Sequence, residues 1–145
     1  MKVKFKKLSP NATVPTYGSP YAAGADLYAC IDSQEVIKAG ETRLIKTGIA
    51  IELPVGYAAF IYARSGLASK RGLAPANKVG VVDCDYRGEV MVALHNHSEV
   101  DQAVDPQERI AQMVIAPYIT AEFEEACELS DTVRGEGGFG STGTK

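Results

Sequence analysis

Short apolar segments separated by turn-forming residues run along most of this chain, and this pattern limits the fold more than any other feature. The strongest strand candidates are residues 36–37, 44–51, 57–63, 90–97 and 110–115, with glycine or proline between each pair of neighbours. Strand and turn signals that recur about every ten residues are typical of a β-sandwich or a β-barrel. Only residues 66–73 favour a helix. We therefore predict an all-β fold with one short helix.

Length, charge and cysteine content argue against several classes of protein. A chain of 145 residues fits one domain of common size. Its net charge of −3 argues against broad electrostatic binding to nucleic acid. No apolar run approaches the roughly 18 residues of a membrane span, and no apolar segment of a signal peptide follows the N-terminal lysines. Three widely spaced cysteines without a CxxC pair favour reduced thiols. We predict a cytoplasmic protein that binds neither nucleic acid nor membrane.

The stretch 77–94 combines a strand pattern with chemically active side chains. An apolar run, residues 79–82, leads into the cluster Asp83-Cys84-Asp85-Tyr86, and residues 90–94 lead away from it. Strand, charged turn and strand predict a β-hairpin, with Gly88 expected to let the chain turn. Carboxylates at such a bend are costly if they are buried without partners, so they are either solvated or functional.

Other polar groups suggest sites for an anion. Arg64-Ser65-Gly66 lies where a strand ends and the short helix begins, and the amides of a helix N-terminus suit phosphate. Gln112 interrupts an apolar run, either as an amide satisfied within the sheet or as a donor aimed into a cleft. Asp26 is equally compatible with capping a turn and with a site. The glycine-rich residues 134–145 form either a disordered terminus or a phosphate-binding segment.

Taken together, five segments closely resemble the signature blocks of the homotrimeric dUTPase (dUTP diphosphatase) family, in the same order: residues 23–27, 63–68, 80–89, 109–113 and 134–143. The resemblance implies a jelly-roll-like distorted β-barrel of the β-clip type over residues 1–133. It also implies a flexible C-terminal tail, 134–145, that closes over the active site. The implied reaction is hydrolysis of dUTP to dUMP and pyrophosphate, which keeps uracil out of DNA and supplies dUMP for thymidylate synthesis. Three copies would share each active site.

The third block carries the implied catalytic and specificity residues. Asp83 matches the general base that activates water for attack on the α-phosphate, a task that a positioned carboxylate can perform. Tyr86 matches the tyrosine that packs against deoxyribose and leaves no room for a 2′-hydroxyl. Asn77 matches the amide that reads uracil together with backbone groups of the hairpin, at Gly80 and Val82.

The resemblance assigns the remaining groups to the triphosphate. The positions that match phosphate contacts are Arg64, Ser65, Gly66, Gln112, Arg134, Ser141 and Thr142. Phe139 matches the ring that covers uracil, and Gly140 is a further substrate-binding position. Asp26 lies in the block that the family places near the phosphate and metal end. The implied cofactor, Mg²⁺, is expected to be held by the triphosphate and waters, without a direct protein ligand.

Two departures from the family pattern stand out. Many relatives have glycine where this chain has Lys78 and before the acidic-Arg-Ile-Ala-Gln block, where it has Pro106-Gln107. We expect the Lys78 amide to remain available as a donor, and the turn at 106–107 to shift Gln112 slightly. The rival functions are dCTP deamination, nucleotide binding without catalysis, and a purely structural jelly roll. The sequence of residues 64–67 and the presence of Asp83 favour the diphosphatase.

Overall fold

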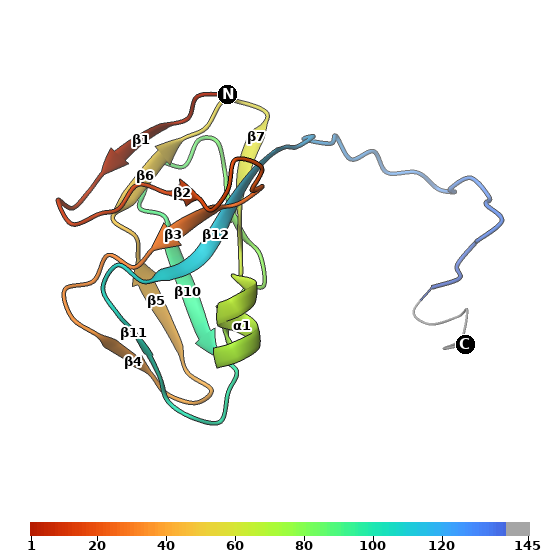
Figure 1. Ribbon diagram of the computed structural model, residues 1–145. Helices are drawn as coiled ribbons and strands as arrows, with labels where there is room; N and C mark the ends of the chain where they lie inside the picture. Colours follow the sequence, from red (N-terminus) through yellow and green to blue (C-terminus); the bar gives the residue numbers. More distant parts are fainter. Residues whose placement is uncertain (139–145) are drawn as a thin grey trace.

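The computed structural model describes residues 1–138 and shows a β-rich body, one short helix and a C-terminal arm, residues 118–138 (Figure 1). The helix, α1, spans Ser65–Arg71. The strands are β1 Lys4–Lys7, β2 Thr16–Tyr17, β3 Ala25–Tyr28, β4 Glu35–Ile37, β5 Thr42–Lys46, β6 Ile49–Glu52, β7 Tyr57–Tyr62, β8 Leu73–Pro75, β9 Gly80–Val82, β10 Met91–Asn96, β11 Gln102–Val104 and β12 Arg109–Pro117.

Antiparallel pairing arranges these strands into four sheets. The largest has the order β2-β3-β12-β7-β9, and a second has the order β5-β10-β8. The pairs β1-β6 and β4-β11 complete the body. The predicted all-β, jelly-roll-like fold is confirmed. Among the described residues, however, the strands form separate sheets and do not close into one continuous hydrogen-bonded barrel.

A single hydrophobic core connects the sheets. Alternate residues of β10, Val92, Leu94 and Asn96, are buried, while their neighbours in the strand are more accessible. This alternation is what a strand with one core-facing side requires. Side chains such as Ile61 of β7 and Ile110 of β12 belong to the same buried cluster. The largest sheet, which carries most of the candidate site, is therefore held against the second sheet by shared apolar contacts.

The helix is as short as predicted but begins one residue earlier and ends two residues earlier than the expected range of 66–73. It ends because Gly72 adopts a left-handed conformation, φ 66°, and donates its N–H to the Ala68 carbonyl at 3.0 Å. Leu73 then begins β8. The Arg71 guanidinium binds Glu108 and Gln102, which ties the end of α1 to the strands beyond it.

The prediction of a β-hairpin around Asp83 was wrong. β9 pairs with β7, whereas β10 pairs with β5 and β8, so the two strands lie in different sheets. The connection between them, residues 83–90, is longer than the two to five residues of an ordinary hairpin loop. A connection of that length lets each strand find a different partner. The consequence is an open space between β9 and β10, where the candidate pocket lies.

Both departures from the family pattern coincide with unusual backbone geometry. Lys78 and Gln107 are the non-glycine residues with positive φ among residues 1–138, each at 64°. Glycine adopts this conformation without steric cost, whereas an L-residue with a side chain does so only at some cost. The Lys78 N–H donates to the Pro75 carbonyl at 3.0 Å. We had expected this N–H to be available to a ligand, but it already has a partner within the chain. The Gln107 side chain donates to the Asn11 carbonyl at 2.6 Å.

The C-terminal arm leaves the body after β12 and runs away from it without helix or strand (Figure 1). Several large apolar side chains of the arm are almost fully exposed: Ile119, Phe123, Leu129 and Val133. The predicted tail residues Phe139, Gly140, Ser141 and Thr142 lie outside the described residues. None of the helical structure in residues 1–138 has the length and apolar character needed to cross a membrane.

Asn96 offers a test of the core. Its buried amide donates to the Ile37 and Val100 carbonyls and accepts from the Ser98 N–H and hydroxyl. We expect Asn96→Ala to lower the free energy of unfolding by about 3 kcal/mol, because buried polar groups lose their partners. Urea denaturation at fixed protein concentration measures this. The exposed control Asn11→Ala should change it by less than about 0.5 kcal/mol; equal effects of the two substitutions would contradict the assignment.

Candidate active site

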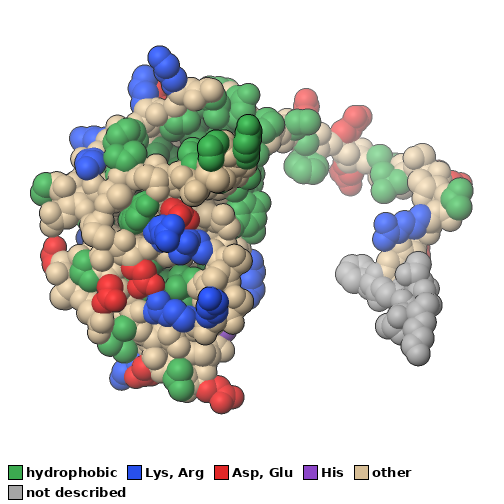
Figure 2. All heavy atoms as spheres, viewed as in Figure 1, with side chains coloured by type: hydrophobic (Ala, Val, Ile, Leu, Met, Phe, Trp, Pro, Cys, Tyr) green, Lys and Arg blue, Asp and Glu red, His purple; other side chains and the backbone are tan. Residues whose placement is uncertain are grey.

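Two arginines and one aspartate of the body form an ion-pair cluster. Figure 2 shows Lys or Arg side chains lying beside Asp or Glu side chains near the middle of one face of the body. Nε of Arg64 donates to Oδ1 of Asp26 at 2.9 Å, and Nη1 of Arg109 donates to Oδ2 at 3.1 Å. The Asp26 side chain is 13% exposed, whereas those of Arg64 and Arg109 are 28% and 50% exposed. Together with Gln112, we call these residues the arginine cluster. Its two guanidinium groups outnumber its carboxylate, and guanidinium suits phosphate oxygens.

The register of the largest sheet assembles the arginine cluster. Gln112 of β12 lies opposite Asp26 of β3 on one side and Tyr62 of β7 on the other. Its side-chain amide nitrogen donates to the Ala63 carbonyl at 2.9 Å, directly after the end of β7. Gly24 is needed beside it, because a Cβ there would approach Oε1 of Gln112 to 2.7 Å. The structure does not test the predicted phosphate contact of Gln112.

Arg64, Ser65 and Gly66 stand together at the start of α1. Arg64 occupies the N-cap position in an extended conformation, and no side chain caps the helix. Ser65 and Gly66 are exposed, and nothing lies within 4 Å of where a Cβ on Gly66 would be. The amides of the first turn of a helix have no intrahelical acceptor. Ligand oxygens can therefore reach the Ser65 hydroxyl and the backbone beside Arg64.

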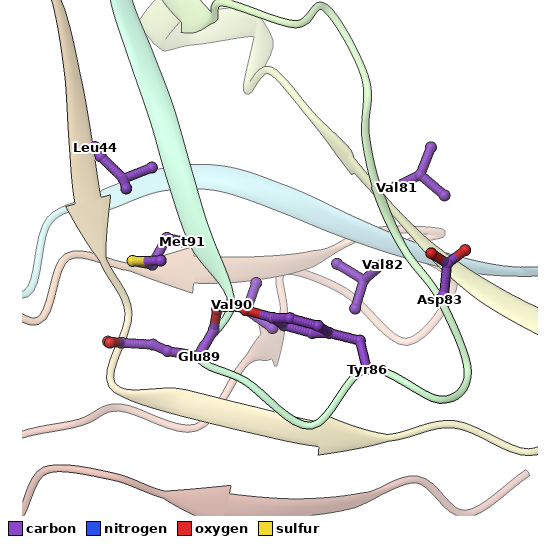
Figure 3. A pocket seen from close by; sticks show the side chains of 8 residues that line it. All are labelled: Leu44, Val81, Val82, Asp83, Tyr86, Glu89, Val90 and Met91. Atoms are coloured by element: carbon purple, nitrogen blue, oxygen red, sulfur yellow. Dashed lines mark hydrogen bonds between the residues drawn. The ribbon is translucent and has the colours of Figure 1, made fainter.

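A second group of residues lines a pocket of about 240 Å³ between β9 and β10 (Figure 3). Its lining residues are Leu44, Val81, Val82, Asp83, Tyr86, Glu89, Val90 and Met91. The Asp83 carboxylate and the Tyr86 ring come from the connection between the strands, and both residues are exposed. The ion pairs of the described residues use other carboxylates, those of Asp26, Glu41, Glu52 and Glu108. Asp83 is thus presented to solvent at the pocket.

The free edge of β9 offers backbone groups to the same region. β9 is the last strand of its sheet and pairs only with β7 within the described chain. A strand at an edge leaves alternate N–H and C=O groups unpaired. Asn77 lies close by, since a Cβ on Gly80 would be 3.4 Å from its Nδ2 atom. Asn77 does not itself line the pocket.

A side-chain contact links the connection between β9 and β10 to the first residue of the C-terminal arm. Sγ of Cys84 lies 3.4 Å from the hydroxyl of Tyr118, the first residue of the arm. This hydrogen bond raises the pKa of the Tyr118 phenol above its ordinary value, with smaller contributions from charge and from burial. The phenol is therefore neutral throughout the physiological pH range. The Tyr118 N–H also donates to the Gly56 carbonyl at 3.0 Å.

The structure does not bring the pocket and the arginine cluster together within one chain. Val82, the neighbour of Asp83, pairs with Ala59, and Arg64 follows five residues later. Five residues of β-strand span about 17 Å. Asp83 and Arg64 thus stand at opposite ends of β7. Arg134 lies on the arm, outside the body, where its Nε donates to the Gly137 carbonyl at 2.7 Å.

Several site residues escaped prediction from the sequence. Arg109 was part of a recognised block, but its role as the second arginine on Asp26 depends on the pairing of β3 with β12. Leu44 and Met91 line the pocket because β5 pairs with β10. An apolar residue in a strand carries no local signal that distinguishes a pocket wall from a core position. These assignments required the sheet topology.

The fold and the two groups of residues define an all-β protein with a pocket and a separate, positively charged arginine cluster. The sequence profile of the dUTPase family matches residues 10–143. A Nautilia profundicola protein named deoxyuridine 5′-triphosphate nucleotidohydrolase is 52% identical, over 99% of each chain. The protein of the same name from Hydrogenobaculum sp. is 51% identical over the full length of both.

The solved structures agree with the sequence relatives. The dUTPase of Staphylococcus bacteriophage 80alpha, in complex with dUpNHpp, superposes with a TM-score of 0.90 at 29% identity, and the alignment covers 98% of each chain. A second structure of the same phage enzyme superposes with a TM-score of 0.81 at 26% identity, and the alignment covers 90% of this chain and 99% of that chain. This chain belongs to the dUTPase family.

We expect Asp26→Asn to weaken binding of inorganic tripolyphosphate about tenfold, because Arg64 and Arg109 lose the charged acceptor that orients them. Isothermal titration calorimetry measures the change. The substitution also removes a negative charge, which by itself would tighten anion binding. Tighter binding in Asp26→Asn would therefore contradict the orienting role. Asp32→Asn, at an exposed carboxylate, controls for charge alone.

Proposed function

We propose that this chain hydrolyses dUTP to dUMP and pyrophosphate, with water attacking the α-phosphorus and Asp83 acting as general base. The observation that carries the mechanism is the pocket between β9 and β10, which has Asp83 and Tyr86 on its wall. Relatives that share about half of the sequence bear the name of a deoxyuridine triphosphate hydrolase. An exposed carboxylate beside a pocket is suited to accept a proton from water.

Uracil would be read by the free edge of β9 together with Asn77. The unpaired backbone groups of β9, at Gly80 and Val82, can supply hydrogen bonds to a base. Val82 and Met91 both line the pocket as apolar side chains (Figure 3). The Tyr86 ring would then lie against the sugar, where a 2′-hydroxyl would collide with it. The narrow slot beside the backbone of β9, where the base would lie, would also exclude the 5-methyl group of thymine.

The triphosphate would extend toward an arginine cluster supplied by a neighbouring copy. The α- and γ-phosphorus atoms of one nucleotide are separated by only two bridging oxygens. The span of about 17 Å along β7 is too long for one chain to present Asp83 at the α-phosphorus and Arg64 at the outer phosphates. A closed homotrimer would place these ends of β7 from different copies beside each other. Ser65, Gly66 and Gln112 would join Arg64 there.

The C-terminal arm supports the same assembly. Ile119, Phe123 and Leu129 expose most of their surface in a single copy, and such side chains commonly mark a contact with another molecule. We assign residues 134–145 to a tail that closes over the nucleotide, with Arg134, Ser141 and Thr142 at the phosphates, Phe139 over the uracil and Gly140 alongside. The predicted dUTPase domain, residues 1–133, would carry the rest of the site.

Magnesium fits this arrangement as an ion carried by the substrate. Among residues 1–138, no group of three or more His, Cys, Asp or Glu side chains is placed to hold a metal. Both carboxylate oxygens of Asp26 already bind arginine. The phosphate oxygens and waters would complete the coordination, as Mg²⁺ commonly prefers. When bound, the ion neutralises phosphate charge.

A cytoplasmic location agrees with the free thiols of Cys30, Cys84 and Cys127.

Asp83→Asn should retain dUTP binding but lose catalysis, because the amide keeps the shape of the carboxylate and cannot accept the proton. We expect kcat to fall about 10³-fold, as measured by pyrophosphate release, with the Kd for a non-hydrolysable analogue changed less than about threefold. The neighbouring exposed carboxylate gives the matched control, Asp85→Asn, which should turn over normally. Near-normal turnover in Asp83→Asn would refute the mechanism.

Mixed assemblies test whether the site is shared. Asp83→Asn and Arg64→Ala should each be nearly inactive alone. If the two groups come from different copies, refolding an equal mixture should restore about a quarter of the wild-type activity, since one site in four combines both intact groups. Mixing the folded variants without refolding serves as the control. Failure to recover any activity in refolded, correctly assembled mixtures would show that one chain supplies both residues.

A further inference from the structure

The connection that carries Tyr86 is braced by its own hydrogen bonds. The Tyr86 N–H donates to the Asp83 carbonyl at 3.2 Å, and its hydroxyl donates to the Glu89 carbonyl at 3.0 Å. The Arg87 guanidinium donates to the carbonyls of Cys84 and Tyr86 at 2.7 and 3.0 Å. These contacts hold the Tyr86 ring along the pocket wall, with its hydroxyl directed toward Glu89 and Val90 (Figure 3).

The acceptor of the Tyr86 hydroxyl is itself anchored to the body. Oε1 of Glu89 accepts the Gly48 N–H at 2.7 Å, in the turn between β5 and β6. Val90, the next residue, is 2% exposed and donates its N–H to the Ile49 carbonyl at 2.8 Å. The Glu89 carbonyl therefore has a fixed position relative to the core. The Tyr86 hydroxyl can reach it only if the ring lies across the backbone of the intervening residues.

The absence of a side chain at Gly88 leaves room for the Tyr86 ring in this position. A Cβ on Gly88 would lie 2.3 Å from the Tyr86 hydroxyl oxygen, 2.5 Å from Cζ and 2.9 Å from Cε2, all closer than real Cβ contacts allow. Gly88 is not among the described glycines with positive φ, so its backbone is open to an L-residue. The sequence suggested that Gly88 serves the turn. The structure shows instead that the aromatic ring requires the absence of a side chain.

We propose that Gly88 is a specificity-determining residue, because it seats the Tyr86 ring at the depth that admits a deoxyribose and rejects a ribose. This inference rests on the proposed function. Gly88 acts through Tyr86 and is therefore a positioning residue, which does not line the pocket itself. A methyl group at this position forces the ring off Gly88. Because the Tyr86 side chain is exposed to solvent, the ring then swings out of the pocket, which leaves room for a 2′-hydroxyl and admits UTP.

The test is the ratio of kcat/KM for dUTP to that for UTP in Gly88→Ala. This outward displacement of the ring lowers the ratio, and we expect a fall of at least about tenfold. Gly18→Ala is the matched control, because nothing lies within 4 Å of a Cβ there and its φ is also not positive. The control should keep the wild-type ratio. An unchanged ratio in Gly88→Ala, including an equal loss of both activities, overturns the proposal.

A double-substitution cycle separates seating of the ring from a general effect on the loop. In a Tyr86→Ala background the ring is absent, so adding Gly88→Ala should leave the dUTP-to-UTP ratio unchanged within about twofold. A further fall in that background would show that Gly88 acts through another group and would overturn the proposal. Wild-type protein that does not hydrolyse dUTP at all would instead refute the proposed function, before any variant is compared.

Discussion

The pairing of β7 with both β12 and β9 is the constraint on which the candidate site depends. One end of β7 leads into Arg64 and the helix, where β12 brings Gln112 and, through β3, Asp26 into register. The other end lies beside Val82, which precedes Asp83. One strand thus has the arginine cluster at one end and a carboxylate-bearing pocket at the other. The rigidity of a paired strand keeps these two groups apart in a single copy.

Much of the fold was accessible from the sequence because its signals are local. The apolar segments at 57–63 and 110–115 became β7 and β12, and the glycine at 72 ended the short helix. Strand periodicity and turn residues report on such features directly.

The features of the fold and of the site that the sequence did not predict depend on contacts between segments that are distant in the chain. Nothing in the sequence around Asp83 shows that β9 and β10 join different sheets, so a hairpin was the natural but wrong expectation. The second arginine on Asp26, Arg109, depends on strand register. The position of the ring of Tyr86 against Gly88 depends on where the core holds Glu89. The role of Gly88 is thus visible only in three dimensions.

The central claim is that the pocket selects a deoxyribonucleotide with uracil as its base and that the chain cleaves it between the α- and β-phosphates. Pyrophosphate release measured side by side with dUTP, dTTP, dCTP and UTP, each with Mg²⁺, tests this most directly. We expect rapid pyrophosphate release from dUTP, and a kcat/KM at least about 100-fold lower for dTTP, dCTP and UTP. Comparable release from UTP or dTTP, or none from dUTP, would contradict it.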